Sequence, residues 1–455
     1  GEGSSGRQSA SASASMAPWK SWLPWGAASA EEARHEDSAR EEGDQAPLNP
    51  TLLVPGIGGT QLSARTKSTG KEERVWVIIE HSDAEFQDKL WCKCNSKTMT
   101  VEPLDEDEEI FVPGDVNGSG LYAIDILDPD VPMRINAVYY FHDMIEALKA
   151  KGHVEGTDLF GFGYDFRQSN RLPAALGAYK ARIEDISARN QGRKVDIVTH
   201  SMGGLLTKAL LAAHPETFAA HVRTWVAVAC PFAGAPGFTM DALVSGTQFL
   251  SGWEQYWFVN RWTMHQTLQE CPSVYEMMPD PSTKWSLDPT LTVWLAAGEG
   301  GKGEERRVTV QTFYGLLEEV LRDNSVSRGG KTTPLPLNPA LVKWAAGTRS
   351  LLKKAKLPKS TSFYNVCGRG FDTAQSVTYG TEDAPLKSLQ ELEKGGGQYE
   401  HVKGDATVPF ESAMADGLHA RGRYEVDGTT DGDHQGLLRN KDVLAKVLGW
   451  LGEGS

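Results

Sequence analysis

The chain has 455 residues, of which 40% are hydrophobic and 23% are charged, and its formal net charge is −14. These proportions are typical of a globular protein with a large core. An acidic chain without a basic cluster argues against nucleic acid as a partner and against docking on anionic membranes through a polybasic patch. No apolar run of the sequence is long enough to cross a bilayer as a helix, so we predict no transmembrane segment.

Residues 1–47 are predicted to form a disordered tail, because residues 31–45 are dense in charge and hold almost no large apolar side chain. Three tryptophans, Trp19, Trp22 and Trp25, interrupt this composition. Tryptophan favours membrane–water interfaces, so they could anchor the chain at a membrane or fold back onto the domain. The folded domain is expected to span residues 48–455.

Beyond the tail, short buried strands alternate with helical patterns. This alternation predicts an α/β fold, a mostly parallel sheet with helices on both faces. Taken in chain order, the expected elements are strands at Thr51–Val54 and Val75–Ile79, a helix at Tyr139–Lys149, a strand at Leu159–Gly163, a helix at Ala174–Arg189, strands at Val195–Val198, Trp225–Cys230, Ser362–Cys367 and Arg423–Val426, and a closing helix at Val443–Leu451.

Two regions break the alternation. The aromatic-rich stretch at residues 238–278 is predicted to be a lid insertion, and we expect its Trp253, Trp257 and Trp262 to contact substrate. A second, cap insertion is predicted at about residues 279–360, with an exposed loop at Gly298–Arg307, which is glycine-rich and charged.

The segment Thr199-His200-Ser201-Met202-Gly203-Gly204 follows a short apolar strand and precedes a helical pattern. This is the arrangement of a nucleophile elbow, in which a sharp turn exposes a serine hydroxyl beside a helix N-terminus. We therefore predict that Ser201 is a nucleophile. The first small position of the usual G-x-S-x-G pattern is occupied here by Thr199.

A serine nucleophile needs a histidine base and a carboxylate that orients the base, and in this fold they follow the serine in the order acid, then histidine. The turn after a late apolar stretch holds Asp405, and the loop before the closing helix holds His434. We predict these two as acid and base, since the strand ends of a parallel sheet converge in space. His200 is not expected to be the base, because its position in the turn points it away. The other candidates considered were His401 and His419 for the base, and Asp416, Asp431 and Asp433 for the acid.

The oxyanion that forms during acyl transfer requires two N–H donors. Met202, which follows the nucleophile, supplies the first. The glycine-rich turn at residues 55–59 comes after the first strand, and its glycines let the backbone approach a substrate closely. We assign the second donor to Ile57.

The five cysteines are Cys92, Cys94, Cys230, Cys271 and Cys367. Their odd number and the tight Cys92-x-Cys94 spacing predict mostly free thiols in a reducing compartment. Because no second ligand pair lies near Cys92 and Cys94, we predict no metal site there.

With these residues assembled, the chain resembles the lecithin:cholesterol acyltransferase-like family of α/β-hydrolases. The matching segments run from about residue 50 to the C-terminus. They are Leu53–Gly56 with Gln61-Leu62, Tyr164–Arg167, Thr199–Gly203, Pro231–Pro236 and Gly404–Pro409, and three more, Val75–Val77, Phe160–Asn170 and Glu411–Gly417, are similar to the plant phospholipase A branch. The chain departs from many members at Phe166, where they have Trp, and at Ala406, where they have Gly.

The resemblance implies an α/β-hydrolase fold with a lid, a triad of Ser201, Asp405 and His434, and no cofactor. It also implies a phospholipid substrate at a membrane or micelle surface. We therefore expect a calcium-independent phospholipase A that works through an acyl-enzyme, in the cytoplasm and peripherally associated with membranes. The alternatives are an O-acyltransferase that passes the acyl group to a sterol or diacylglycerol, and an inactive lipid-binding module.

Overall fold

The computed structural model describes residues 48–78, 83–115, 117–130, 138–246, 261–298 and 301–453. The predicted tail at residues 1–47 lies outside the described residues, as do Trp253 and Trp257 of the predicted lid.

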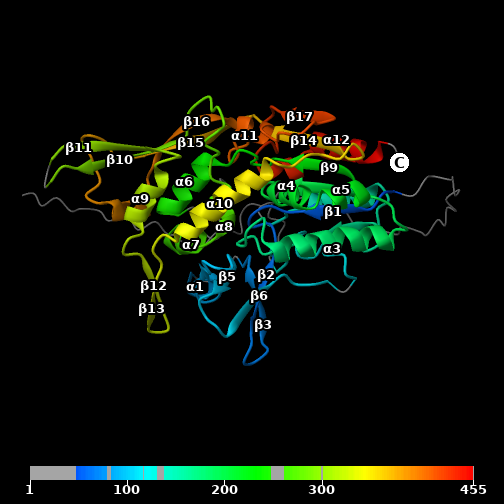
Figure 1. Ribbon diagram of the computed structural model, residues 1–455, viewed down its shortest axis with the longest axis horizontal. Coiled ribbons are helices and arrows are strands. Elements are labelled where there is room, and N and C mark those ends of the chain that lie inside the picture. The colour runs from blue at the N-terminus through cyan, green and yellow to red at the C-terminus, as the bar shows by residue number, and fades with distance from the viewer. Residues whose placement is uncertain are drawn as a thin grey trace, which may run out of the picture. The chain divides into compact units, whose positions relative to one another are not determined.

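Six parallel strands form the central sheet, in the order β17-β14-β9-β8-β1-β7 (Figure 1). Strands β1 and β8 are buried along their whole length, which explains why each reads as an apolar run rather than an alternating one. The predicted parallel sheet is confirmed. Its strands are β1 (Thr51–Val54), β7 (Leu159–Gly161), β8 (Val195–His200), β9 (Val222–Val228), β14 (Ser362–Gly368) and β17 (Gly422–Val426).

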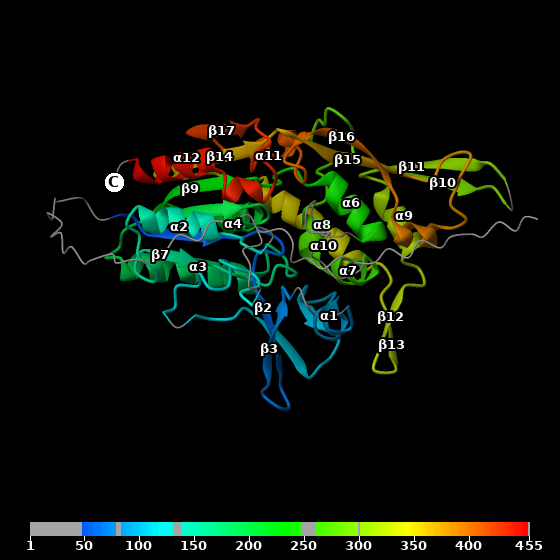
Figure 2. The same ribbon diagram turned by 180° about the vertical axis from the view of Figure 1, so that it is seen from behind.

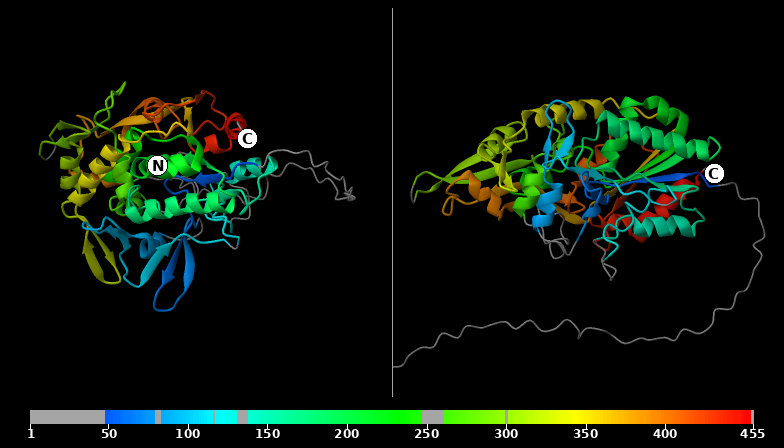
Figure 3. Two further views of the ribbon diagram at one scale, coloured as in Figure 1. Left: turned by 45° about the vertical axis from the view of Figure 1, so that its right-hand side comes forward. Right: turned by 90° about the horizontal axis from the view of Figure 1, so that it is seen from below.

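Helices cover both faces of this sheet. Helices α3 (Pro173–Arg189), α4 (Gly203–Ala213) and α5 (Pro215–His221) lie on one face, toward the viewer in Figure 1. Helices α2 (His142–Ala150) and α12 (Lys441–Gly452) contact each other on the opposite face (Figure 2). The view from below shows the sheet between these two helical layers (Figure 3, right).

A second, four-stranded sheet lies beside the central one, in the order β11-β10-β15-β16 (Figure 1). Two of its strands, β10 (Thr290–Ala296) and β11 (Gly303–Thr309), come from the predicted cap, and β15 (Phe371–Tyr379) and β16 (Gln398–Gly404) follow the central strand β14. The prediction of an exposed loop at Gly298–Arg307 is therefore wrong for residues 303–307, which belong to β11. Strand β11 pairs antiparallel with β10, and most of its side chains are exposed, so the strand is charged and shows no apolar run.

Helices make up most of the described remainder of the two predicted insertions. They are α6 (Pro236–Ser245), α7 (Arg261–Leu268), α8 (Pro272–Glu276), α9 (Phe313–Val320) and α10 (Pro339–Leu352), with a hairpin of β12 (Ser325–Arg328) and β13 (Lys331–Pro334). The assignment of these segments as lid and cap stays a prediction.

The region between β1 and α2 forms small sheets outside the main one. They hold β2 (Leu62–Thr66), β3 (Glu72–Trp76) and β6 (Glu108–Phe111), then β4 (Cys92–Cys94) and β5 (Val101–Pro103), beside α1 (Asp83–Leu90). The strand predicted at Val75–Ile79 ends instead at Trp76 and begins at Glu72, and Ile79 lies outside the described residues. The charged first half of β3 was not predicted, because it has no apolar pattern. It belongs to a hairpin with exposed charges, in which Arg65 forms an ion pair with Glu72 at 2.8 Å.

Candidate active site

The turn between β8 and α4 places Ser201 at its apex. Ser201 has φ +53°, a left-handed conformation that is rare for residues with a side chain, and its N–H donates to the carbonyl of Val228 at 2.9 Å. A Cβ on Gly203 would lie 2.5 Å from the carbonyl oxygen of Pro55, and one on Gly204 would lie 1.9 Å from Sγ of Cys230. The two glycines therefore let the elbow close against its neighbours.

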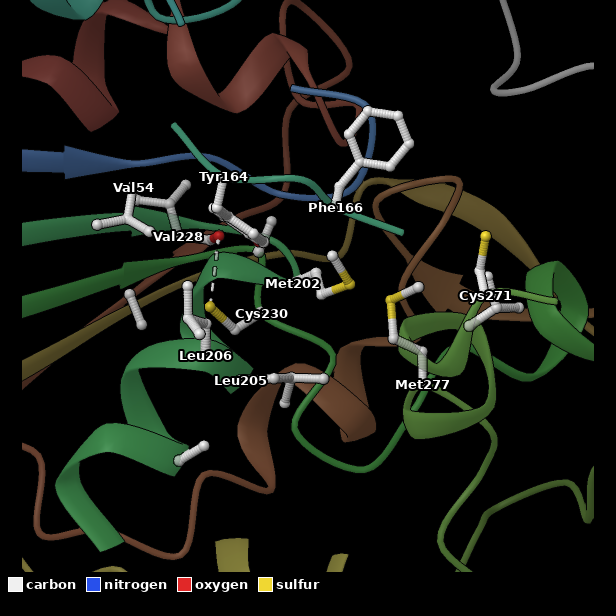
Figure 4. Packing of buried hydrophobic residues seen from close by; sticks show 14 of the residues in the cluster. Val54, Tyr164, Phe166, Met202, Leu205, Leu206, Val228, Cys230, Cys271 and Met277 are labelled. Carbon is white, nitrogen blue, oxygen red and sulfur yellow. Dashed lines mark hydrogen bonds between the residues drawn. The ribbon is translucent and has the colours of Figure 1, made fainter. Parts of the chain in front are cut away.

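Thr199 is tolerated at the first small position because its hydroxyl has a buried partner. The indole Nε1 of Trp225 donates to Oγ1 of Thr199 at 3.0 Å, and Thr199 is fully buried. Figure 4 shows the packing around the elbow, where Met202, Leu205 and Leu206 lie among the side chains of the core.

The structure brings Ser201, His434 and Asp405 together from three distant parts of the sequence. Nε2 of His434 lies 2.9 Å from Oγ of Ser201, and Nδ1 of His434 lies 2.8 Å from Oδ2 of Asp405. All three side chains are buried. A carboxylate only accepts, so it fixes the proton of His434 on Nδ1 and leaves the lone pair of Nε2 for the proton of the serine.

The second oxygen of Asp405 is held by the backbone. Oδ1 accepts from the N–H groups of Thr407 at 3.0 Å and Val408 at 2.6 Å. Ala406, between Asp405 and Thr407, has φ +75°, a conformation that favours glycine. Ala406 is the position at which the sequence departs from the glycine of many members of the family that it resembles. The turn directs the carboxylate of Asp405 toward His434.

None of the rival candidates contacts His434 or Ser201 through a described hydrogen bond. Asp416 binds Arg423 at 2.7 Å and Asp431 binds Arg439 at 2.8 Å. Oδ2 of Asp433 accepts from the N–H of Gly436 at 3.2 Å. His401 is exposed on β16, and His419 lies in the segment between α11 (Phe410–Met414) and β17. The structure therefore groups only the predicted pair around the serine.

The glycine-rich turn at residues 55–59 is held by three aromatic side chains. Oη of Tyr164 donates to the carbonyl of Pro55 at 3.0 Å, the N–H of Gly56 donates to Oη of Tyr140 at 2.9 Å, and Nε1 of Trp76 donates to the carbonyl of Gly58 at 2.7 Å. The turn is thus fixed on both sides of Ile57.

The N–H groups of Ile57 and Met202 have no hydrogen-bond acceptor among the described residues. Both residues belong to segments in contact with Ser201, because Met202 follows it and a Cβ on Gly56 would lie 2.6 Å from its Cβ. This arrangement suits the two donors of an oxyanion hole.

A small cavity of about 30 Å³ borders Ser201 and His434. The wall is mainly apolar, as an acyl chain requires. Its apolar members are Ile57, Pro231, Ala235, Phe238, Met277 and Val408, and Tyr140, His200, Thr407 and Gln435 complete it.

Trp262 lies on α7 and does not line this cavity. Its ring packs edge-on against Trp91, with the ring centroids 5.3 Å apart, in a small cluster with Val326 and Leu335. A substrate contact by the predicted lid tryptophans therefore stays a prediction.

The hydrogen-bonding roles of two buried residues, Tyr140 and His200, were not predicted from the sequence. Tyr140 precedes α2, and His200 ends β8, where it contacts Tyr140 and His434 rather than Ser201. Burial and the nearby His434 lower the pKa of His200 well below its ordinary value. The adjacency of His200 to the serine was visible in the sequence, but its partners come from residues 60 and 234 positions away.

The described residues contain no group of three or more His, Cys, Asp or Glu side chains that could hold a metal ion. All five cysteines are buried and form no disulfide in the structure. Burial raises the pKa of Cys230 to about 12, so this thiol stays protonated.

The central sheet is parallel and has helices on both faces, a serine elbow follows its strand β8, and the histidine and the aspartate lie on later loops. These features define an α/β-hydrolase enzyme. A chain of the solved Tle4–Tli4 complex shares this fold with a TM-score of 0.50 and 16% identity, covering 90% of this chain and 98% of that chain.

The family follows from the sequence relatives. Residues 73–296 match the lecithin:cholesterol acyltransferase family. The chain is 43% identical over 443 residues to the Arabidopsis thaliana protein named phospholipase A(1) LCAT3, covering 95% of each chain. It is also 43% identical over 413 residues to lecithin-cholesterol acyltransferase-like 4 of Arabidopsis thaliana, covering 90% of this chain and 76% of the relative. The protein belongs to the lecithin:cholesterol acyltransferase family.

No helix in the described part of the chain has the length and hydropathy needed to cross a membrane.

Proposed function

We propose that this protein is a serine phospholipase A that hydrolyses a fatty-acyl ester of glycerophospholipids. The observation that carries the proposal is the hydrogen-bonded series from Asp405 through His434 to Ser201, beside a mainly apolar cavity. The lipid substrate is supported by the relative named phospholipase A(1), which is 43% identical over 95% of its length. That name also favours the sn-1 ester.

The reaction starts when Nε2 of His434 takes the proton of Ser201 as Oγ attacks the ester carbonyl carbon. The carbonyl oxygen becomes an oxyanion, which accepts from the N–H groups of Ile57 and Met202. His434 then gives the proton to the departing glycerol oxygen. A lysophospholipid leaves, and the acyl group stays on Oγ of Ser201.

Water completes the cycle by the same route. His434 takes one proton of the water as its oxygen attacks the acyl carbon, and the second oxyanion forms in the same place. When this intermediate collapses, the proton passes to Oγ of Ser201 and a free fatty acid leaves. An alcohol in the position of that water would receive the acyl group, which is how the same site would act as an acyltransferase.

Hydrolysis is tested by offering phosphatidylcholine with distinguishable sn-1 and sn-2 chains, with and without sterol or diacylglycerol. We expect free fatty acid and lysophospholipid as the products, with the sn-1 chain released. A new neutral ester as the main product would assign the chain to acyl transfer. Loss of activity with a chelator would contradict the proposed calcium independence.

The nucleophile is tested by Ser201→Ala, which should abolish turnover and labelling by a fluorophosphonate while leaving the melting temperature nearly unchanged. The matched control is Ser350→Ala, because Ser350 is exposed on α10. Phospholipase activity retained by Ser201→Ala would exclude this residue as nucleophile.

We also propose that the enzyme meets its substrate at a membrane or micelle surface inside a reducing compartment, the cytoplasm. A phospholipid substrate supports the surface, and five unpaired cysteines support the compartment. Cosedimentation with phosphatidylcholine vesicles tests binding to a membrane surface. Fractionation of cells tests the location in the cytoplasm.

A further inference from the structure

A second series of buried hydrogen bonds runs behind the candidate triad. Oη of Tyr140 lies 2.9 Å from the N of Gly56 and 2.6 Å from Nδ1 of His200. Nε2 of His200 lies 2.9 Å from the carbonyl oxygen of His434. Tyr140 is 7% exposed and His200 is 1% exposed, so both side chains are buried. We call the series from Gly56 through Tyr140 and His200 to His434 the relay.

The two ends of the relay, with a neutral His200, fix the direction of every hydrogen bond in it. The carbonyl of His434 can only accept, so Nε2 of His200 carries a proton; burial lowers the pKa of His200 well below its ordinary value, so the ring is neutral and Nδ1 is an acceptor. The N–H of Gly56 can only donate, so Oη of Tyr140 accepts from it and gives its own proton to Nδ1 of His200. His200 is therefore the neutral Nε2–H tautomer.

The local sequence provides the space that the relay needs. A Cβ on Gly59 would lie 2.3 Å from the Tyr140 ring, so only glycine leaves room for the tyrosine there. The Tyr140 and His200 rings pack edge to face at an interplanar angle of 73°, with their centroids 5.4 Å apart. The glycines of the turn thus serve two contacts, Gly56 with Ser201 and Gly59 with Tyr140.

The relay joins the two loops whose relative position decides the reaction. One end holds Gly56, the neighbour of the oxyanion donor Ile57. The other end holds the backbone of His434, whose N–H also donates to the carbonyl of Asp405 at 2.7 Å. A shift of either loop by a fraction of an ångström would misalign the base or the donor with the transition state.

We propose that Tyr140 and His200 are positioning residues, which hold the oxyanion turn and the base His434 in register through the relay. The proposal rests on the proposed function, because it assumes that Ser201, His434 and Ile57 act in ester cleavage. Neither Tyr140 nor His200 exchanges a proton with substrate in this scheme.

The first test compares Tyr140→Phe with Tyr179→Phe. Each variant removes one buried hydroxyl, but Oη of Tyr179 bonds Oγ1 of Thr207 at 2.9 Å, outside the relay. Both variants should lower the melting temperature by similar amounts. We expect only Tyr140→Phe to lower kcat, by about 10- to 100-fold with KM nearly unchanged, because the misalignment affects the transition state. Equal kcat values per active site for the two variants, counted by fluorophosphonate titration, would overturn the proposal.

The second test uses two replacements of His200. The amide of His200→Gln offers an oxygen to Tyr140 and an N–H to the carbonyl of His434, whereas His200→Leu offers neither. We expect the kcat of His200→Gln to stay within about fivefold of the wild-type value. The kcat of His200→Leu should be at least about ten times lower than that of His200→Gln. Equal kcat losses in the two variants would show a role in packing alone. Nitrogen-15 NMR of the wild-type imidazoles should find His200 as the Nε2–H tautomer at pH 7, and the Nδ1–H tautomer would contradict the relay.

The kinetic measurements use p-nitrophenyl butyrate, a soluble ester, alongside phosphatidylcholine. If the wild type cleaves only the soluble ester, the phospholipase proposal fails while the relay is still tested. If both esters are cleaved and Tyr140→Phe behaves as Tyr179→Phe does, the relay fails and the phospholipase proposal stands.

Discussion

Gly56 and Ser201 lie so close together that no side chain fits between their loops. A Cβ on Gly56 would lie 2.6 Å from Cβ of Ser201 and 3.0 Å from its Oγ. Separations below about 3 Å are far inside van der Waals contact, so an added methyl must push the two loops apart. Glycine at this position is therefore needed by the site as well as by the turn.

Gly56→Ala is expected to lower kcat by at least about 100-fold, because the methyl displaces either the nucleophile or the oxyanion turn. Steady-state kinetics on a soluble ester measures this. The control is Gly177→Ala, since Gly177 is exposed on α3 and a Cβ there meets nothing within 4 Å. That control should keep full activity and gain about 0.5–1 kcal/mol of stability. Full activity in Gly56→Ala would contradict the contact with Ser201.

Asp405→Asn is expected to lower kcat by about 10⁴-fold without unfolding the protein. The amide oxygen can still accept from Thr407 and Val408, but the amide nitrogen then faces Nδ1 of His434 and donates to it. His434 is forced into the tautomer whose Nε2 carries a proton and cannot take one from Ser201. The kcat and the melting temperature measured on one preparation separate this effect from unfolding, and a variant with near-normal kcat would exclude Asp405 as the orienting acid.

Gly204 and Cys230 form a pair whose substitutions should depend on each other. A Cβ on Gly204 would lie 1.9 Å from Sγ of Cys230, so Gly204→Ala should overpack the elbow and cost about 1–3 kcal/mol. Cys230→Ala removes the sulfur, and in that background Gly204→Ala should cost less, since alanine is the better helix former at a position in α4. Urea unfolding of the four proteins in this cycle gives the coupling free energy, and additive effects would show that the sulfur is not the obstacle.

The buried Lys208 is expected to make the free energy of unfolding depend on pH. It is 7% exposed on α4, and burial lowers its pKa from 10.5 to about 8. Between these pH values the unfolded chain binds more protons than the folded one, so this residue makes the free energy of unfolding rise with pH. Its charged form destabilises the fold below about pH 8, and the penalty is lost as the pH approaches 10.5.

Lys208→Met should therefore gain stability relative to the wild type at pH 7. That advantage should shrink by about 3 kcal/mol between pH 7 and pH 10.5, the equivalent of the pKa difference. Urea unfolding at both pH values measures the change. The matched control, Lys343→Met, replaces an exposed lysine on α10 and should show no such shift. A pH-independent difference between Lys208→Met and the wild type would contradict the burial of a charged lysine.

The parts of this protein that depend on local patterns could be predicted from the amino-acid sequence. The apolar runs at Thr51–Val54 and Val195–Val198 predicted buried strands, and the serine and glycines after the second run predicted an elbow. The order of Asp405 and His434 along the chain agreed with the fold that these strands predict. Elements whose residues face solvent were predicted less well, as the charged strand Gly303–Thr309 shows, because they lack an apolar pattern.

The side chains that support the site could be identified from the folded structure but not from the sequence. The hydrogen bonds of Tyr140 join residues 84 positions before it and 60 positions after it in the chain. Nothing in the local sequence distinguishes that hydroxyl from the hydroxyl of Tyr179, which bonds Thr207 instead. Buried polar groups must find partners wherever the folded chain brings them, so their roles depend on long-range packing that local patterns do not encode.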